Sequence, residues 1–110
     1  MTGTVQRAAI TASDWRRLER NTLRGFLTLE LPSGLILREC TYHRAATGAE
    51  WIGLPGKPQL DRDGRQRKDA TGKALYTSIV EFKGKEPRER FQAAALAAVR
   101  ELLATMEPVA

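Results

Sequence analysis

The sequence contains very few of the residues on which metal centres and nucleophilic catalysis depend. Among 110 residues there is one cysteine, Cys40, and one histidine, His43. One cysteine excludes an internal disulfide, and a single Cys-His pair is too small for a zinc ligand set. Nucleophile motifs and phosphate-binding glycine loops are also missing. We therefore expect no enzymatic activity, no bound metal and no small-molecule cofactor.

Long hydrophobic runs are missing as well. No apolar run approaches the roughly 18 residues that a membrane-spanning helix needs. Residues 1–20 contain arginines but no apolar core of a signal peptide. Together with the single cysteine, this composition predicts a cytoplasmic protein without a membrane partner. The length favours one domain, because two separate cores would be too small to close.

Positive charge is in excess, and it is confined to two segments. The chain carries 18 Lys and Arg residues against 13 Asp and Glu residues, a formal net charge of +5. Residues 1–24 hold five arginines and two acidic residues, and residues 55–73 hold six basic and three acidic residues. Such a distribution is typical of a protein that binds a polyanion, although charge that serves only solubility gives the same pattern.

Alternating apolar and polar residues predict a set of β-strands. Residues 26–31 and 35–44 alternate with a period of two and flank Pro32-Ser33-Gly34, which predicts a β-hairpin. Residues 50–54 and 74–82 predict two further strands. Within residues 35–44, strict alternation places Leu37 and Cys40 on opposite faces. Residues 13–24 are ambiguous, and we expect an extended edge segment there.

One helix completes the predicted fold. Pro87 suits a first helical turn, and Phe91, Ala95, Val99, Leu102 and Met106 recur on one face of the Ala- and Leu-rich stretch that follows. We therefore predict an α+β fold, an antiparallel sheet of about four to five strands with one C-terminal α-helix on one face. Residues 1–24 form a basic N-terminal arm or edge strand. Residues 25–107 form a single domain with a long basic loop at residues 55–73, and no internal repeat is apparent.

Aromatic residues are few, and each must serve either the core or a ligand. We expect Trp51 and Phe82 in the core, because a chain this small has few other large apolar side chains. Cys40 is expected in the core too. Tyr42 lies near Arg38 and Arg44, and it fits the core and stacking on a nucleobase equally well.

Charge and aromatic residues together favour a nucleic-acid-binding protein for DNA or RNA. No recognition helix is evident, so we expect weak sequence specificity, with recognition of single strands or of nucleic-acid shape. The alternative is a protein-interaction or structural homodimer whose strand edge is the binding surface. A homodimer is expected in either case, because a small sheet leaves edges and one face uncovered. The predicted nucleic-acid-binding residues are Arg16, Arg17, Arg20, Arg24, Lys57, Arg62, Arg65, Arg67, Lys68, Lys73 and Tyr42.

Several segments resemble the SpoVG family of bacterial regulators. They are LILRECTYHR at 35–44, EWIGLPGKP at 50–58, the Asp63-Gly64 turn, YTSIVEF at 76–82 and the helix that opens at Pro87. The resemblance covers about residues 24–103 and extends to uncharacterised small bacterial proteins with similar segments. It implies a dimeric sheet-plus-helix protein that binds DNA or RNA as a regulator.

The sequence departs from the family pattern at three places. Ser78 stands where the family has Asp, and Val80-Glu81 stands where it has Ala-His. The loop before Ala74 is also longer. The matching positions include Tyr76 and Ile79 of the last predicted strand.

Overall fold

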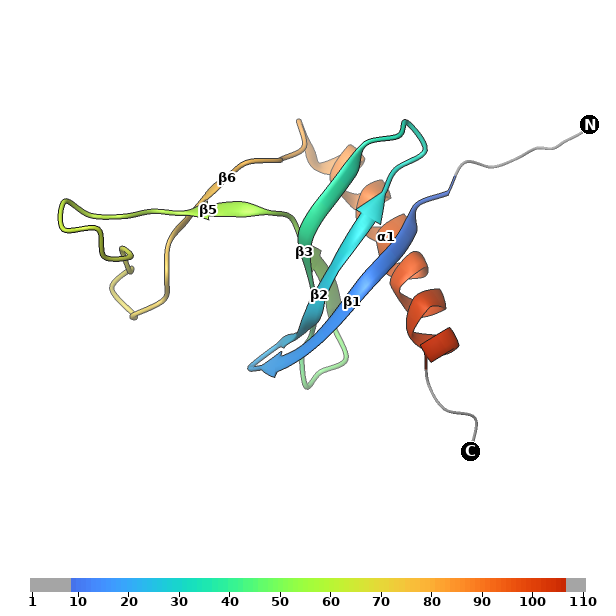
Figure 1. The fold of residues 1–110 in the computed structure, drawn as a ribbon, viewed down its shortest axis with the longest axis horizontal. Helices are drawn as coiled ribbons and strands as arrows, with labels where there is room; N and C mark the ends of the chain where they lie inside the picture. Colours follow the sequence, from blue (N-terminus) through green and yellow to red (C-terminus); the bar gives the residue numbers. More distant parts are fainter. Residues whose placement is uncertain (1–8, 107–110) are drawn as a thin grey trace, which may run out of the picture.

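The computed structural model describes residues 9–106 (Figure 1). The first four strands form one antiparallel sheet in which they lie side by side in sequence order, two short strands form a second sheet, and the helix packs on one face of the first. This arrangement confirms the predicted α+β fold. The elements are β1 (Thr11–Arg20), β2 (Leu23–Glu30), β3 (Ile36–Arg44), β4 (Glu50–Gly53), β5 (Gly56–Pro58), β6 (Tyr76–Ser78) and α1 (Lys85–Met106).

The core lies between the four-stranded sheet and α1. Its members are apolar side chains from three strands and one face of the helix, and they exclude water almost completely: Leu27, Leu29, Leu37, Cys40, Tyr42, Ile52, Phe91, Ala95 and Val99. Phe82 packs at the rim, with its ring centroid 4.9 Å from that of Phe91. Met106, expected on the buried helix face, is 54% exposed at the C-terminal end of α1, so that expectation was wrong.

A bulge in β3 decides which of its residues are buried. Leu27 of β2 pairs with Cys40, and Leu29 pairs with Leu37, so β3 has one more residue than β2 between these two pairs. Glu39, within the bulge, has a left-handed backbone with φ of 60°. A bulge shifts the alternation by one residue, which puts Leu37 and Cys40 on the same, helix-covered face. The predicted strict alternation was therefore wrong.

β1 forms one edge of the sheet, in the segment expected to be extended. Its pairing with β2 is irregular between Ser13 and Arg16 and again between Arg17 and Arg20. Asp14 in the first irregularity has φ of 56°. Bulges and charged side chains on an edge strand hinder pairing with another chain. Residues 1–8 of the predicted basic arm lie outside the described residues.

Residues 55–73, predicted to be a long basic loop, contain paired segments and are continuous with residues 74–78. Residues 55–78 together form an ordered extension, the β-arm, which projects away from the four-stranded sheet (Figure 1). β5 and β6 form its base, and the strand predicted over residues 74–82 is reduced to Tyr76–Ser78. The return segment then passes Phe82 and enters α1. The β-arm thus carries most of the second basic segment away from the body of the protein.

Cys40 is predicted to react slowly with thiol reagents in the native protein. Its side chain is fully buried, and burial together with the nearby Glu39 carboxylate raises the pKa of the thiol to about 11. At pH 8 the native protein therefore holds almost no thiolate. Modification by an Ellman-type reagent should need denaturant, and rapid modification without denaturant would contradict this placement.

Candidate nucleic-acid interface

The outer part of the β-arm is closed by a ring of three backbone hydrogen bonds. The Gln59 N–H donates to the Leu75 carbonyl at 3.0 Å, the Leu75 N–H to the Arg67 carbonyl at 2.9 Å, and the Arg67 N–H to the Gln59 carbonyl at 2.8 Å. Three strand segments therefore meet at one junction. Two tight hairpins leave this junction, and the base formed by β5 and β6 is the third branch.

The two hairpins repeat the same eight-residue pattern. Residues 59–66 and 67–74 each have Asp at the third position, Gly at the sixth and a basic residue at the seventh: Asp61, Gly64 and Arg65, then Asp69, Gly72 and Lys73. Both glycines have positive φ, 80° and 88°, as a tight hairpin turn requires. The expectation of no internal repeat was therefore wrong, and the spacing of the two Asp-x-x-Gly segments was the signal that it missed.

The aspartate of each hairpin is used to hold its own turn. Asp61 Oδ1 accepts the N–H groups of Asp63 and Arg65 at 2.9 and 3.0 Å. Asp69 Oδ1 accepts the hydroxyl and N–H of Thr71 and the N–H of Lys73, and these bonds lower the pKa of the Asp69 carboxyl. Both carboxylates thus stabilise the backbone and form no ion pair with the arm's own cations.

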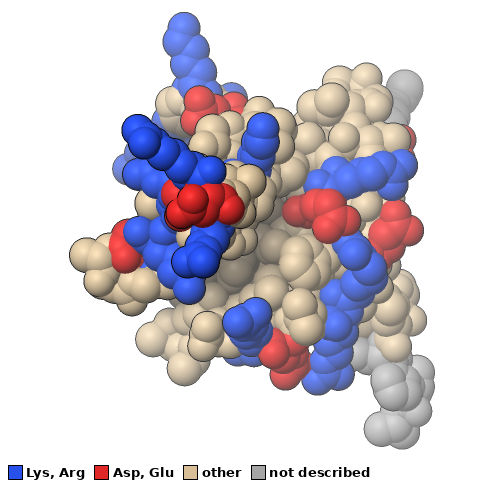
Figure 2. Space-filling model, turned by 60° about the vertical axis from the view of Figure 1, so that its left-hand side comes forward, with Lys and Arg blue, Asp and Glu red and all other residues tan. Residues whose placement is uncertain are grey.

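The basic residues of the β-arm are exposed and form no ion pair within residues 9–106. One of them, Arg67, donates to the side-chain oxygen of Gln59 at 3.2 Å. Figure 2 shows Lys and Arg side chains, with Asp and Glu side chains among them, on both sides of a central hollow. The β-arm therefore presents a group of available cations: Lys57, Arg62, Arg65, Arg67, Lys68 and Lys73.

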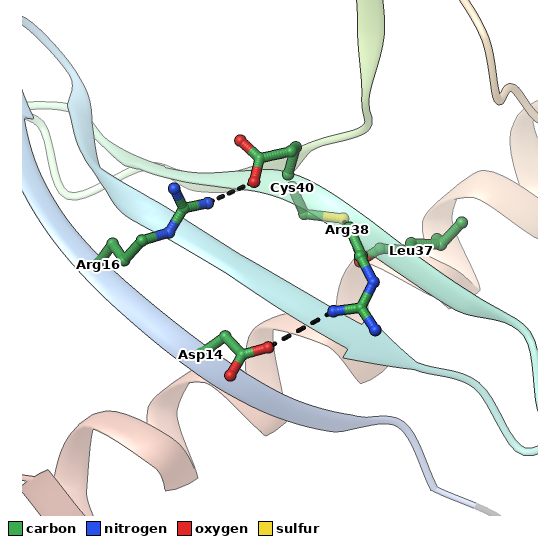
Figure 3. A network of polar contacts seen from close by, with 6 residues as sticks. Asp14, Arg16, Leu37, Arg38 and Cys40 are labelled. Atoms are coloured by element: carbon green, nitrogen blue, oxygen red, sulfur yellow. Dashed lines mark hydrogen bonds and ion pairs between the residues drawn. The ribbon is translucent and has the colours of Figure 1, made fainter.

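Most of the predicted basic residues nearer the N-terminus form ion pairs or hydrogen bonds within the protein, unlike those of the β-arm. Arg16 reaches across β2 and pairs with Glu39 at 2.5 Å, beside a second pair between Asp14 and Arg38 at 3.8 Å (Figure 3). Arg16 also lies over the ring of Phe26, 5.4 Å from its centroid. Such exposed pairs are weak, but they hold these side chains on the sheet.

The three remaining arginines of this group differ in availability. Arg17 pairs with Glu19 at 2.6 Å. Arg24 donates to the backbone carbonyl of Arg44 at 3.0 Å. Arg20 is exposed and forms no ion pair among the described residues. Most of the unpaired predicted cations therefore lie on the β-arm.

Tyr42 cannot serve as a stacking platform, which corrects its inclusion among the predicted binding residues. It is only 5% exposed and belongs to the core under α1, on the same face of β3 as Cys40 two residues before it. Its hydroxyl donates to the Glu50 carboxylate, which also accepts from Arg100 at 2.5 Å. Burial and this hydrogen bond raise the pKa of Tyr42 to about 12. The residue ties β3 and β4 to the helix.

Trp51, in contrast, lies outside the core. The next residue along β4, Ile52, belongs to the core under α1, so alternation turns Trp51 to the other face of the sheet, here named the open face. It is 38% exposed and stacks parallel to His43, with centroids 5.2 Å apart and 2° between the planes. The expectation of a core tryptophan was wrong because α1 covers only one face of this sheet.

Both ring nitrogens of His43 lie within hydrogen-bonding distance of threonine hydroxyls. Its Nδ1 lies 3.0 Å from the Thr22 hydroxyl, and its Nε2 lies 3.0 Å from the Thr41 hydroxyl. Burial, with a smaller contribution from the Lys73 charge, lowers the pKa of His43. A neutral ring with two hydrogen-bonded nitrogens is therefore a fixed support for Trp51.

A groove of about 880 Å³ separates the open face from the β-arm. Phe26, Thr41 and His43 line it from the sheet, and Pro58 and Tyr76 line it from the β-arm. Gly53 lies opposite Thr41, and a Cβ there would collide with the Thr41 hydroxyl. The groove thus combines aromatic rings with access from solvent, and the hollow is visible in Figure 2.

Comparison with known proteins adds no assignment. No protein-family model, curated protein or solved structure matches this chain. Within residues 9–106, no helix has the length and apolar character needed to cross a membrane, and no group of three or more His, Cys, Asp or Glu side chains is arranged to hold a metal ion.

Proposed function

We propose that this protein binds nucleic acid, and that the β-arm supplies the main phosphate contacts. The observation that carries the proposal is the group of six exposed arm cations with no ion-pair partner among the described residues. Because the junction and the two turns are already hydrogen-bonded, little backbone entropy is lost when these cations meet a polyanion.

Weak sequence specificity is part of the proposal. Contacts to phosphates position a protein without reading sequence. The one helix buries an apolar face against the sheet, and its charged residues form i,i+4 pairs such as Lys85–Glu89 and Arg90–Glu86. It thus offers no basic face for a major groove. We also propose that it is a regulator or accessory factor that acts as a homodimer, as the resemblance to the SpoVG family implies, and that it is cytoplasmic, as its single cysteine suggests.

The alternative, pairing with another protein through a strand edge, has less support. The side chain of Gln92 on α1 accepts from the Ile52 N–H and donates to the Ile52 carbonyl, both at 2.8 Å. These bonds occupy outward polar groups of β4. The other edge strand, β1, has two irregularities in its pairing with β2, and such bulges hinder the addition of another strand. Exposed apolar residues such as Leu35 and Ile36 at the β2–β3 turn remain available for a protein contact.

Fluorescence-anisotropy titration tests the proposal. The full chain is titrated against labelled single- and double-stranded DNA and RNA at several salt concentrations. We expect salt-sensitive binding, with log affinity falling by roughly 0.7 to 0.9 per log unit of salt for each phosphate contact. Binding to none of the four probes at low salt would contradict the proposal, and sedimentation velocity would then test self-association.

A further inference from the structure

The geometry points to a specific ligand class for the open face: we infer that Trp51, which stacks on the groove-lining His43, and the groove itself bind unpaired nucleobases, so that the protein selects single strands over duplexes. This inference rests on the proposed function and adds a base-binding site to the phosphate-binding β-arm. In a duplex the bases are stacked on one another, so their faces are unavailable to an aromatic side chain.

Trp51 has the features of a preformed stacking platform. One face of its indole lies against His43, whose two ring nitrogens are held by threonine hydroxyls. The side chain remains 38% exposed. A platform that is already oriented loses little rotamer entropy when a base stacks on it. Trp51 belongs neither to the core cluster nor to the partly buried residues that pack against it.

Tyr76 provides a second aromatic surface across the groove. It belongs to β6, lines the groove and is 58% exposed. Phe26 and His43 line the facing wall. A base that enters between these walls therefore meets aromatic rings from the sheet and from the β-arm.

The charges of the groove and of the β-arm determine how a bound nucleic-acid strand is oriented. Two carboxylates, Glu39 and Glu81, line the groove, whereas the unpaired arm cations lie on the β-arm. Glu39 is neutralised in part by Arg16, and Arg88 is the one cation among the groove-lining residues. A phosphate is therefore less favoured inside the groove than on the β-arm. We expect the bases to enter the groove while the backbone follows the arm cations.

A second copy of the chain is the competing occupant of the same exposed surface. The charge pattern favours nucleic acid, because the cations beside the groove would repel the identical cations of another β-arm. A second copy is therefore an outcome that the experiment must detect. If a nucleobase occupies the surface, loss of Trp51 lowers the affinity for single strands. If a second copy occupies it, loss of Trp51 weakens self-association.

Two alanine variants test the inference. The full chains with Trp51→Ala and with Tyr76→Ala are titrated against labelled oligothymidylate and against a DNA duplex of equal length. Each change is expected to lower the oligothymidylate affinity by about 5- to 150-fold, the range for loss of one stacked base. Duplex affinity and the salt slope should change little, and Trp51→Phe and Tyr76→Phe should retain most of the single-strand affinity.

The experiment also includes a control variant outside the groove and a measurement of tryptophan fluorescence. Ile79→Ala removes an apolar residue that is 65% exposed but does not line the groove, so it should leave both affinities unchanged. Oligothymidylate should quench part of the tryptophan fluorescence in the wild-type protein. That quenching should disappear in Trp51→Ala, although Trp15 remains. Circular dichroism verifies that each variant is folded.

The outcomes separate this inference from the proposed function. Wild-type binding that Trp51→Ala and Tyr76→Ala leave unchanged would overturn the base site while phosphate binding by the β-arm stands. Equal losses for single strands and duplexes would also overturn it. Loss of self-association without loss of single-strand affinity would identify a second copy as the occupant and overturn it. If the wild type binds no nucleic acid, the proposed function itself fails.

Discussion

Replacing Arg65, Arg67 and Lys68 together with glutamine is expected to lower nucleic-acid affinity by about 100-fold near physiological salt. The three side chains are exposed and lie on the hydrogen-bonded part of the β-arm, without ion-pair partners among the described residues. Each lost phosphate contact removes roughly 0.7 to 0.9 from the slope of log affinity against log salt. The slope should therefore fall by about two to three, as measured by anisotropy at several salt concentrations.

A charge-matched variant is the control for this prediction. Lys83→Gln, Lys85→Gln and Arg90→Gln together remove the same charge near the start of α1, where two of the three side chains pair with glutamates. This variant should lose much less affinity, because only long-range attraction is reduced. If the two triple variants lose affinity equally, the effect is one of net charge, and the β-arm is not the phosphate-binding element.

Phe91→Ala is expected to lower the free energy of unfolding by about 3 to 5 kcal/mol, the usual loss when a buried phenylalanine is truncated. Phe91 lies on α1, is 6% exposed in the core between the sheet and the helix, and packs on Phe82. Such a loss is a large part of the stability of a small domain. Urea denaturation followed by circular dichroism measures it.

The same substitution also probes the attachment of the β-arm. Phe82 follows β6, so its contact with Phe91 fixes the point at which the β-arm returns to the body. As a control, Leu60→Ala changes a 59% exposed residue of the β-arm and should alter stability by less than about 0.5 kcal/mol. A loss below about 1 kcal/mol for Phe91→Ala would contradict its position in the core.

Local patterns were sufficient to predict the α+β class, the β2–β3 hairpin and the C-terminal helix, because period and turn residues act over short distances. The β3 bulge was not predictable in this way. It depends on Glu39, a residue type with no special preference for positive φ. One inserted residue then reversed the expected orientation of Leu37 relative to Cys40. A period-two pattern predicts which residues alternate but not where the alternation slips.

The candidate site was predicted in part. The basic residues of the β-arm were recognised from composition alone, but their lack of ion-pair partners depends on tertiary structure. Trp51 was assigned to the core because a chain this small has few other large apolar side chains to fill one. Its exposure depends on which face of the sheet α1 covers, and this cannot be inferred from β4 itself. The hairpin repeat was visible in the sequence at the spacing of Asp61 and Asp69.

The most direct test of nucleic-acid binding by the β-arm and the open face follows the ¹⁵N-labelled full chain by NMR during titration with oligothymidylate. We predict shifts of the Trp51 indole signal and of the backbone amides of residues 57–76. The Trp15 indole and the amides of residues 93–106 on α1 should stay in place. Shifts confined to α1 or to the β1 edge, or no shifts at all, would contradict this placement of the ligand.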